Sequence, residues 1–219
     1  MLRLYLVRHG QTAWNHTGRI QGHSDVPLDE VGREQARQAA DWLAQRMQAP
    51  LAIYTSDLKR CLQTAEILAA RLNAPLHPTP ALRERNWGAW EGLTRDEVVE
   101  RYPEHHFTYL YDPLAGTPPE GEPMTAFWDR VQQFARQLYE QYTEGELIVV
   151  GHGGSLRIML CDALAGDIQT YRRIRLDNAA VSVIERTDGR IWVALLNYAG
   201  FLEAHPDPCL SEQSEGSHQ

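Results

Sequence analysis

The chain has 219 residues, of which 43% are hydrophobic and 23% charged, and its formal net charge at pH 7 is −8. This length and composition suit one globular domain with a sizeable core and an elaborated edge. The acidic balance and the lack of any Lys/Arg block disfavour nucleic acid or an acidic membrane as a partner. An anionic ligand would need a local basic pocket built from arginine, because Lys59 is the only lysine.

The three cysteines, Cys61, Cys161 and Cys209, are too few and too widely spaced to predict a disulfide framework. The N-terminal residues MLRLYLVRHG hold only a short apolar run interrupted by charge, unlike a signal peptide. No stretch approaches the roughly 18 apolar residues of a membrane span. We therefore expect a protein of the reducing cytoplasm, and the sequence predicts no particular oligomeric state.

The first part of the chain alternates wholly apolar runs, which predict buried strands, with segments of helical periodicity. In chain order we expect a strand, a loop or short helix, a helix, a strand and a helix: Leu4–Val7, Gly10–Gly22, Asp29–Met47, Leu51–Tyr54 and Thr55–Leu72. Asp29 is the expected N-cap of the first long helix. The proline-punctuated segment Pro75–Leu82 is expected to be a connector with at most one short strand.

The second part continues the alternation after a proline-rich interruption. Asp96–Arg101 predicts one or two helical turns, whereas Pro103–Pro123 shows no period and predicts an irregular excursion. The segments that follow predict a helix, a buried strand, a helix and the two strands of a hairpin: Thr125–Tyr142, Leu147–Val150, Ser155–Leu164, Ala180–Ile184 and Ile191–Leu196.

This order of elements predicts an α/β fold with a mainly parallel mixed sheet that is flanked by helices on both faces. The closing hairpin supplies the antiparallel strands. We expect residues 1–203 to form a single domain with a proline-rich cap excursion at about 100–124. The polar segment 204–219 is expected to be a disordered tail.

Basic side chains follow three of the predicted buried strands. Arg8 and His9 come directly after the first strand, Arg60 lies in the first helical turn after the second, and His152 follows the third. Sites in open α/β sheets form beyond the carboxyl ends of the strands, where helix N-termini add positive dipole ends. If the three strands are neighbours, these side chains converge on one spot that fits a tetrahedral dianion.

Four segments carry a resemblance to a known family, and they are LVRHGQTAWN, SDLKRCLQTAE, LRERNWGAWEG and VVGHGG, in that order. They resemble the signature segments of the histidine phosphatase superfamily, the phosphoglycerate mutase-like proteins, from about Leu4 to Ser155. The resemblance implies a phosphoglycerate mutase-like fold, a phosphohistidine intermediate, and neither a metal nor a cofactor. It favours the phosphatase branch, with an α-ribazole phosphatase-like enzyme among the candidates.

The resemblance also implies roles for particular residues. His9 would be the nucleophile, and Arg8, Arg60 and His152 would hold the phosphoryl oxygens. Glu84 would protonate the leaving alkoxide and then activate the hydrolytic water.

A second group of residues would support these. Asn15 would add a neutral donor, while Gly10 and Gly153 would remove side chains where the backbone approaches phosphate. Thr12 and Gln21 would either touch the substrate or hold the loop.

Several alternatives remain open on the sequence alone. Glu91 is a weaker candidate for the acid, and the aromatic residues between 87 and 111 either wall the leaving-group pocket or pack the cap onto the body.

Within the family, the alternative activity is that of a cofactor-dependent phosphoglycerate mutase. Outside it, His9, Glu84 and His152 match a zinc hydrolase site, although Arg8 would then face a dication. A non-catalytic phosphate-binding regulator is the last alternative. We expect a metal-independent phosphomonoesterase acting on a small phosphorylated metabolite.

Overall fold

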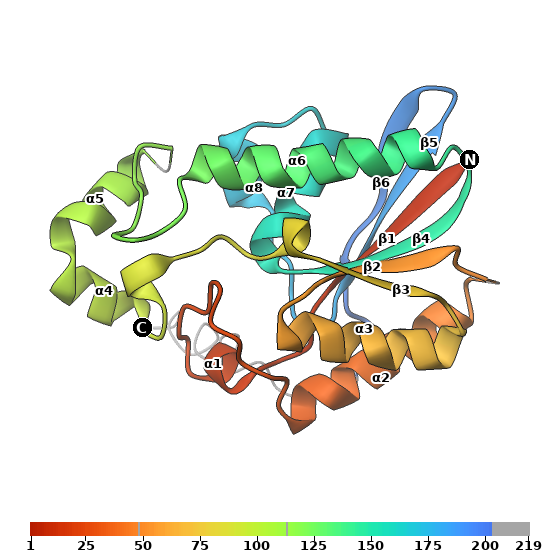
Figure 1. Cartoon of the computed structure of the whole chain (residues 1–219), viewed down its shortest axis with the longest axis horizontal. Helices are drawn as coiled ribbons and strands as arrows, with labels where there is room; N and C mark the ends of the chain where they lie inside the picture. The colour runs from red at the N-terminus through yellow and green to blue at the C-terminus, as the bar shows by residue number, and fades with distance from the viewer. Residues whose placement is uncertain (48, 113, 203–219) are drawn as a thin grey trace, which may run out of the picture.

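The computed structural model describes residues 1–47, 49–112 and 114–202 (Figure 1), so the predicted tail 204–219 lies outside the described residues. The strands are β1 (Leu2–Arg8), β2 (Ala52–Ser56), β3 (Leu76–Thr79), β4 (Gly145–Gly151), β5 (Val181–Thr187) and β6 (Arg190–Tyr198). The helices are α1 (Ala13–His16), α2 (Glu30–Ala44), α3 (Lys59–Leu72), α4 (Arg95–Arg101), α5 (Pro103–Tyr111), α6 (Met124–Gln141), α7 (Gly153–Ala163) and α8 (Ile168–Arg173). Two short 3₁₀ turns, Pro80–Leu82 and Gly88–Trp90, join them. None of the helices in these residues has the length and apolar character to cross a membrane.

The strands form one mixed sheet in the order β3-β2-β4-β1-β5-β6. The first four of these run parallel, and β5 pairs antiparallel with both β1 and β6. The predicted mainly parallel mixed sheet with a closing hairpin is therefore confirmed. This order places β4 between β2 and β1, so the three strands that precede the basic residues are neighbours.

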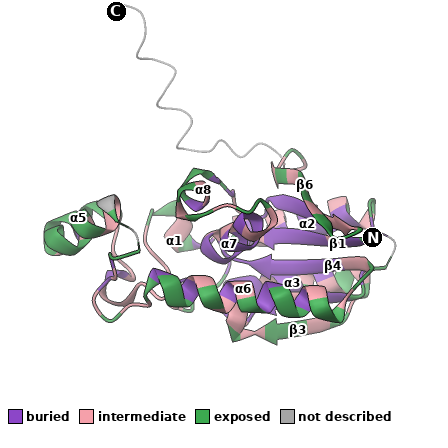
Figure 2. Cartoon of the chain, turned by 90° about the horizontal axis from the view of Figure 1, so that it is seen from above, coloured by how far each residue is buried: buried purple, intermediate pink, exposed green. Residues whose placement is uncertain are grey.

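Helices cover both faces of the sheet because side chains alternate between the faces along each strand. Leu4 and Leu6 of β1 pack with α6 and α7 in one core cluster. Tyr5 and Val7 pack with α2 and α3 in the other. The central strands are buried on both sides (Figure 2), which explains the wholly apolar runs Leu4–Val7 in β1 and Leu147–Val150 in β4.

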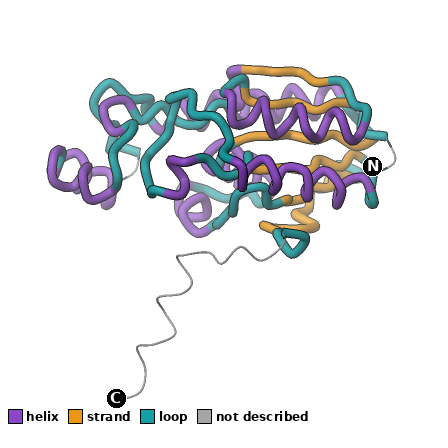
Figure 3. Tube along the Cα trace, turned by 90° about the horizontal axis from the view of Figure 1, so that it is seen from below, coloured by secondary structure: helices purple, strands orange, loops and turns teal. Residues whose placement is uncertain are grey.

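The long amphipathic helices lie close to where periodicity places them, and Asp29 caps α2 by accepting a hydrogen bond from the Gly32 N–H. Two helices were not predicted. The segment expected to be irregular contains α5, which begins with Pro103 at its first turn, and α8 follows the N-cap Asp167. Helices α4 and α5 extend beyond the carboxyl ends of the parallel strands (Figure 3), and α5 lies within the segment 100–124 for which the sequence predicts a cap excursion.

Candidate active site

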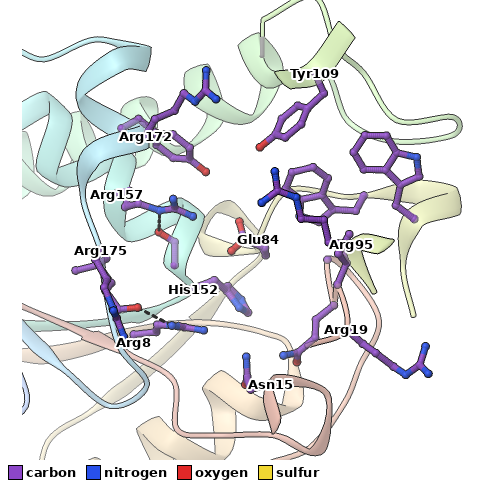
Figure 4. Close-up of a pocket in the computed structure, with 18 of the residues that line it drawn as sticks. Arg8, Asn15, Arg19, Glu84, Arg95, Tyr109, His152, Arg157, Arg172 and Arg175 are labelled. Carbon is purple, nitrogen blue, oxygen red and sulfur yellow. Dashed lines mark hydrogen bonds between the residues drawn. The ribbon is translucent and has the colours of Figure 1, made fainter. Parts of the chain in front are cut away.

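A cavity of about 670 Å³ opens beyond the carboxyl ends of β1, β2 and β4. This volume lies within the range of about 300–1,000 Å³ that is usual for small-molecule sites. Its walls come from these strand ends, from the cap helices α4 and α5, and from α7 and α8 (Figure 4). The lining includes eight of the ten predicted site residues: Arg8, His9, Asn15, Gln21, Arg60, Glu84, His152 and Gly153.

His9 is held at the floor of this cavity with one ring nitrogen left available. Its backbone N–H donates to the Gly151 carbonyl at 3.0 Å, which ties the end of β1 to the end of β4. Its Nδ1–H donates to the Gly10 carbonyl at 2.7 Å, so Nε2 carries the lone pair. Burial, together with the nearby Arg60 and Arg8 guanidiniums, holds the pKa of His9 well below its usual value. The ring is therefore neutral at neutral pH and suited to nucleophilic attack.

Arg8 presents an unsatisfied donor beside this ring. Its Nη1 donates to the Leu176 carbonyl at 2.6 Å, while its buried Nε has no hydrogen-bond partner within the described residues. Burial, and next the neighbouring Arg157, lower the pKa of Arg8 to about 10, so the group stays charged at neutral pH. A buried N–H without a partner is costly, and an anionic oxygen would satisfy it.

Arg60 is only 1% exposed and is fixed by three hydrogen bonds. Its Nη1 and Nη2 donate to the carbonyls of Ser24 and Gly22 at 2.8 and 2.7 Å, and its Nε donates to Nδ1 of His152 at 3.2 Å. A guanidinium has five N–H groups. Two donors of Arg60 therefore remain for a ligand in the cavity.

In the observed geometry, the imidazole of His152 forms hydrogen bonds with protein groups, including Arg60, and not with a ligand. Because Nδ1 accepts from Arg60, the proton lies on Nε2, which donates to Oγ of Ser56 at 2.8 Å. The ring meets His9 edge-on at a centroid distance of 5.2 Å. Both ring nitrogens are thus engaged by β2 and α3, and the expected direct contact of His152 with a phosphoryl oxygen is not available in this orientation.

Glu84 projects into the cavity from the segment that follows the first 3₁₀ turn (Figure 4). Its Oε2 accepts from the Gly154 N–H at 2.8 Å and its Oε1 from the Arg85 N–H at 2.9 Å. The neighbouring Arg83 pairs instead with Asp57 at 2.6 Å. The carboxylate is therefore aimed by two backbone donors and is not held in a surface ion pair with Arg83.

A sequence model described as the histidine phosphatase superfamily (branch 1) matches residues 4–199 of the chain. The chain belongs to the histidine phosphatase superfamily. Phosphoserine phosphatase 1 of Hydrogenobacter thermophilus is 32% identical over 210 residues, covering 94% of this chain and 99% of that protein. A probable phosphoglycerate mutase of Yersinia pestis is 34% identical over 194 residues, covering 89% of each. The crystal structure of a putative α-ribazole-5′-P phosphatase from Escherichia coli matches with a TM-score of 0.83 at 27% identity, covering 90% of this chain and 96% of that one.

These comparisons confirm two predictions, the phosphoglycerate mutase-like fold and the phosphatase activity. Two predicted site residues nevertheless lie outside the cavity lining. Thr12 is fully buried and caps α1, exchanging hydrogen bonds with Asn15. A Cβ at Gly10 would lie 2.3 Å from the Gly32 carbonyl oxygen, so this glycine allows the loop to pack on α2. The expectation that Gly10 clears space for phosphate is therefore corrected.

Asn15 lines the cavity with its amide nitrogen available. Its Oδ1 accepts from both the N–H and the hydroxyl of Thr12, so the amide group is oriented with its nitrogen toward the ligand space (Figure 4). Gln21 also lines the cavity, and its Oε1 is buried without a partner among the described residues. Both residues are thus placed where they can contact a ligand.

Glu91, the alternative acid, holds a loop and does not line the cavity. Its Oε1 accepts from the His23 and Trp87 N–H groups, and its Oε2 accepts from the N–H and hydroxyl of Ser24. Gly22 in this loop has a φ of +51°, and a Cβ there would lie 2.1 Å from the Glu91 carboxylate. Glu91 therefore holds the loop whose carbonyls, at Gly22 and Ser24, accept hydrogen bonds from Arg60.

Three of the aromatic residues between 87 and 111 fulfil both expectations, whereas Phe107 is 62% exposed and does not line the cavity. Trp87 stacks on Trp90 with a centroid distance of 5.8 Å, and Tyr109 of α5 meets both rings edge-on. All three also line the cavity, so they pack the cap and form one wall of the site. Sequence reasoning missed Arg157, although it lies four residues after Gly153 and therefore on the same face of α7.

Proposed function

We propose that this histidine phosphatase hydrolyses phosphomonoesters of small metabolites through a phosphohistidine formed on His9. The observation that carries the proposal is the hydrogen bond from Nδ1 of His9 to the Gly10 carbonyl, which leaves the Nε2 lone pair for attack. The two unused donors of Arg60 and the orphaned Nε of Arg8 support the binding of a phosphoryl dianion beside that nitrogen. Preorganised donors of this kind stabilise the charge of a phosphoryl-transfer transition state.

In the first step the Nε2 lone pair of His9 forms a bond to phosphorus, and the bond from phosphorus to the ester oxygen breaks. The protonated carboxyl of Glu84 gives its proton to the departing oxygen. In the second step the Glu84 carboxylate takes a proton from water, whose oxygen attacks phosphorus as the phosphorus–nitrogen bond breaks. Acid–base help of this kind contributes about 10²–10⁴ in rate.

The roles of the remaining residues follow from their positions. Asn15 donates from its amide nitrogen, Gln21 contacts the substrate, and His152 fixes the orientation of Arg60. The site requires no metal, because the arginines already supply the positive charge. A zinc ion at His9, Glu84 and His152 fits poorly, since both nitrogens of His152 have partners.

The relatives support small phosphorylated substrates, since their names include phosphoserine and α-ribazole phosphate. A sugar phosphate, a phosphoglycerate-like acid, a nucleotide-derived phosphate and a broad specificity all agree with the cavity. We include in the proposal a cytoplasmic location and no nucleic-acid or membrane partner. The net charge of −8 and the two free, buried cysteines Cys61 and Cys161 support this part.

The test is a rapid-quench experiment with a ³²P-labelled monoester, with and without a chelator. We expect acid-labile label on the parent protein, none on the His9→Ala variant, and release of free phosphate that the chelator does not affect. Label on the variant would contradict His9 as the nucleophile. Transfer of phosphate to a second hydroxyl would favour the mutase. Turnover that the chelator inhibits would favour the zinc hydrolase, and a complete absence of turnover would favour the non-catalytic regulator.

A further inference from the structure

The cavity carries more positive charge than one phosphoryl group needs. Seven arginines line it: Arg8, Arg19, Arg60, Arg95, Arg157, Arg172 and Arg175. Glu84 is the only carboxylate in the lining among the residues that the structure describes. Acidic residues outside the lining balance two of the arginines, since Arg19 pairs with Glu97 and Arg175 with Asp177. With Arg8 and Arg60 assigned to the transferred phosphoryl group, three cations remain in a protein of net charge −8.

Of these three, Arg157 has a side chain that is held by a hydrogen bond and a ring contact. Its Nε donates to the Gly153 carbonyl at 2.8 Å, and its guanidinium lies 4.4 Å from the ring centroid of Tyr171. The side chain is half-buried, and no acidic residue in the described part of the chain pairs with it. Its two terminal nitrogens are therefore held in place with their N–H groups available to a ligand.

The position of Arg157 separates it from the reacting atoms. A Cβ at Gly153 would lie 3.7 Å from Nη2 of Arg157 and 3.8 Å from Nε of Arg8, so the two guanidiniums border the same space. After burial, the charges of Arg60 and Arg8 lower the pKa of His9, whereas the charge of Arg157 is the one that most lowers the pKa of Arg8. Figure 4 shows Arg8 and Arg157 extending from the same wall into the cavity, with Arg172 farther toward the rim. The guanidinium of Arg157 is thus next to that of Arg8, which in turn lies beside His9.

We propose that Arg157, with Arg172 at the rim, forms a second anion subsite that selects phosphomonoesters whose leaving group carries a carboxylate or a second phosphate. This inference rests on the proposed function, because the substrate must also place its scissile phosphoryl group at His9. Arg172 is exposed and strengthens the attraction without a fixed contact. The planar guanidinium of Arg157 can donate two parallel hydrogen bonds to two oxygens of a carboxylate or of a phosphate.

The test compares substrates that differ only in the second anion. The carboxylate pair is 3-phosphoglycerate and glycerol 3-phosphate, and the phosphate pair is fructose 1,6-bisphosphate and fructose 6-phosphate. We expect kcat/KM of the parent enzyme to favour the doubly anionic member of at least one pair by about 10- to 100-fold. The pair that shows the preference identifies which anion the subsite takes.

The variant Arg157→Gln is expected to remove this preference by raising KM for the doubly anionic substrate about 10- to 100-fold at nearly unchanged kcat. The singly anionic partner should change less than about threefold. Arg173→Gln is the matched control, because Arg173 is an exposed neighbour on α8 that does not line the cavity. It removes the same charge and should leave the preference intact.

Two results would overturn the subsite: a parent enzyme with no preference in either pair, or equal losses on both members of a pair in Arg157→Gln. A separate measurement distinguishes failure of the subsite from failure of the proposed function. Calorimetry measures the affinity of the His9→Ala variant for the same compounds, and therefore the effect of the second anion on binding, without any turnover. Absence of turnover by the parent, combined with tighter binding of the doubly anionic compounds, would reject the proposed reaction and retain the subsite.

Discussion

The Nε–H of Arg60 donates to Nδ1 of His152 at 3.2 Å, although the two residues are 92 positions apart in the chain. The bond forms because α3 begins directly after β2, whose neighbour in the sheet is β4, and His152 follows β4. It fixes the imidazole in the tautomer with its proton on Nε2, and it fixes the plane of the guanidinium. The cation beside His9 is therefore oriented before a substrate binds.

Replacement of this guanidinium by an amine tests how much that orientation contributes. We expect Arg60→Lys to lower kcat/KM by about 10²–10³-fold, because lysine keeps the charge but cannot bind the two loop carbonyls, His152 and a phosphoryl oxygen together. Steady-state kinetics measure the effect. Arg71→Lys is the control, since Arg71 lies on the same helix in an exposed pair with Asp41 and should change little. Similar losses in the two variants would contradict the prediction.

The proposed acid role of Glu84 predicts that the effect of its replacement depends on the leaving group. Glu84→Gln keeps an oxygen that can accept from the Gly154 N–H but has no proton to give. We expect turnover of an alkyl phosphate to fall about 10²–10⁴-fold, and that of p-nitrophenyl phosphate far less, because nitrophenolate needs little protonation. Equal losses on both esters would remove Glu84 as the acid.

Glu91 is expected to behave differently from Glu84. The amide in Glu91→Gln offers one accepting oxygen in place of two, so N–H groups of the loop that holds Arg60 lose their acceptors. We expect kcat/KM to fall about 10- to 100-fold on alkyl and aryl esters alike, since the defect is in positioning. The free energy of unfolding should fall by about 1–3 kcal/mol. A loss confined to alkyl esters would instead indicate an acid role for Glu91.

The two buried histidines predict a loss of stability in acid. Burial and the Arg60 charge hold the pKa values of His9 and His152 well below the usual 6.5. Below about pH 6.5 the unfolded chain therefore binds protons that the folded protein does not, so the free energy of unfolding falls as pH decreases. Each histidine contributes about 1.4 kcal/mol per pH unit in this range.

Urea unfolding at pH 7.5 and 5.5 measures this dependence. We expect His9→Gln to show a smaller fall than the parent, by the contribution of one histidine. His105→Gln, which replaces an exposed histidine, should match the parent. Parallel falls in the parent and His9→Gln would show that the His9 ring is not kept neutral by burial.

Local sequence determined the elements whose stability depends on burial of a continuous apolar surface. The runs Leu4–Val7 in β1, Ala52–Tyr54 in β2 and Leu147–Val150 in β4 are wholly apolar because both faces of these strands are covered. The stripes of α2, α3 and α6 follow the helical period for the same reason. The sequence alone does not reveal α5, because none of its described residues is buried, and α8 has only six residues. Such short helices depend on caps and neighbours more than on periodicity.

The sequence by itself also predicted which groups gather at one cavity, since Arg8, His9, Arg60 and His152 lie at or just after the ends of strands that share one edge of a parallel sheet. Only the tertiary structure decided how these groups act on one another. Strand order brought Arg60 against His152, and the loop held by Glu91 fixed the same arginine. Hydrogen bonds and charge interactions of this kind depend on distances of a few ångströms between segments far apart in the chain, and no local pattern encodes those distances.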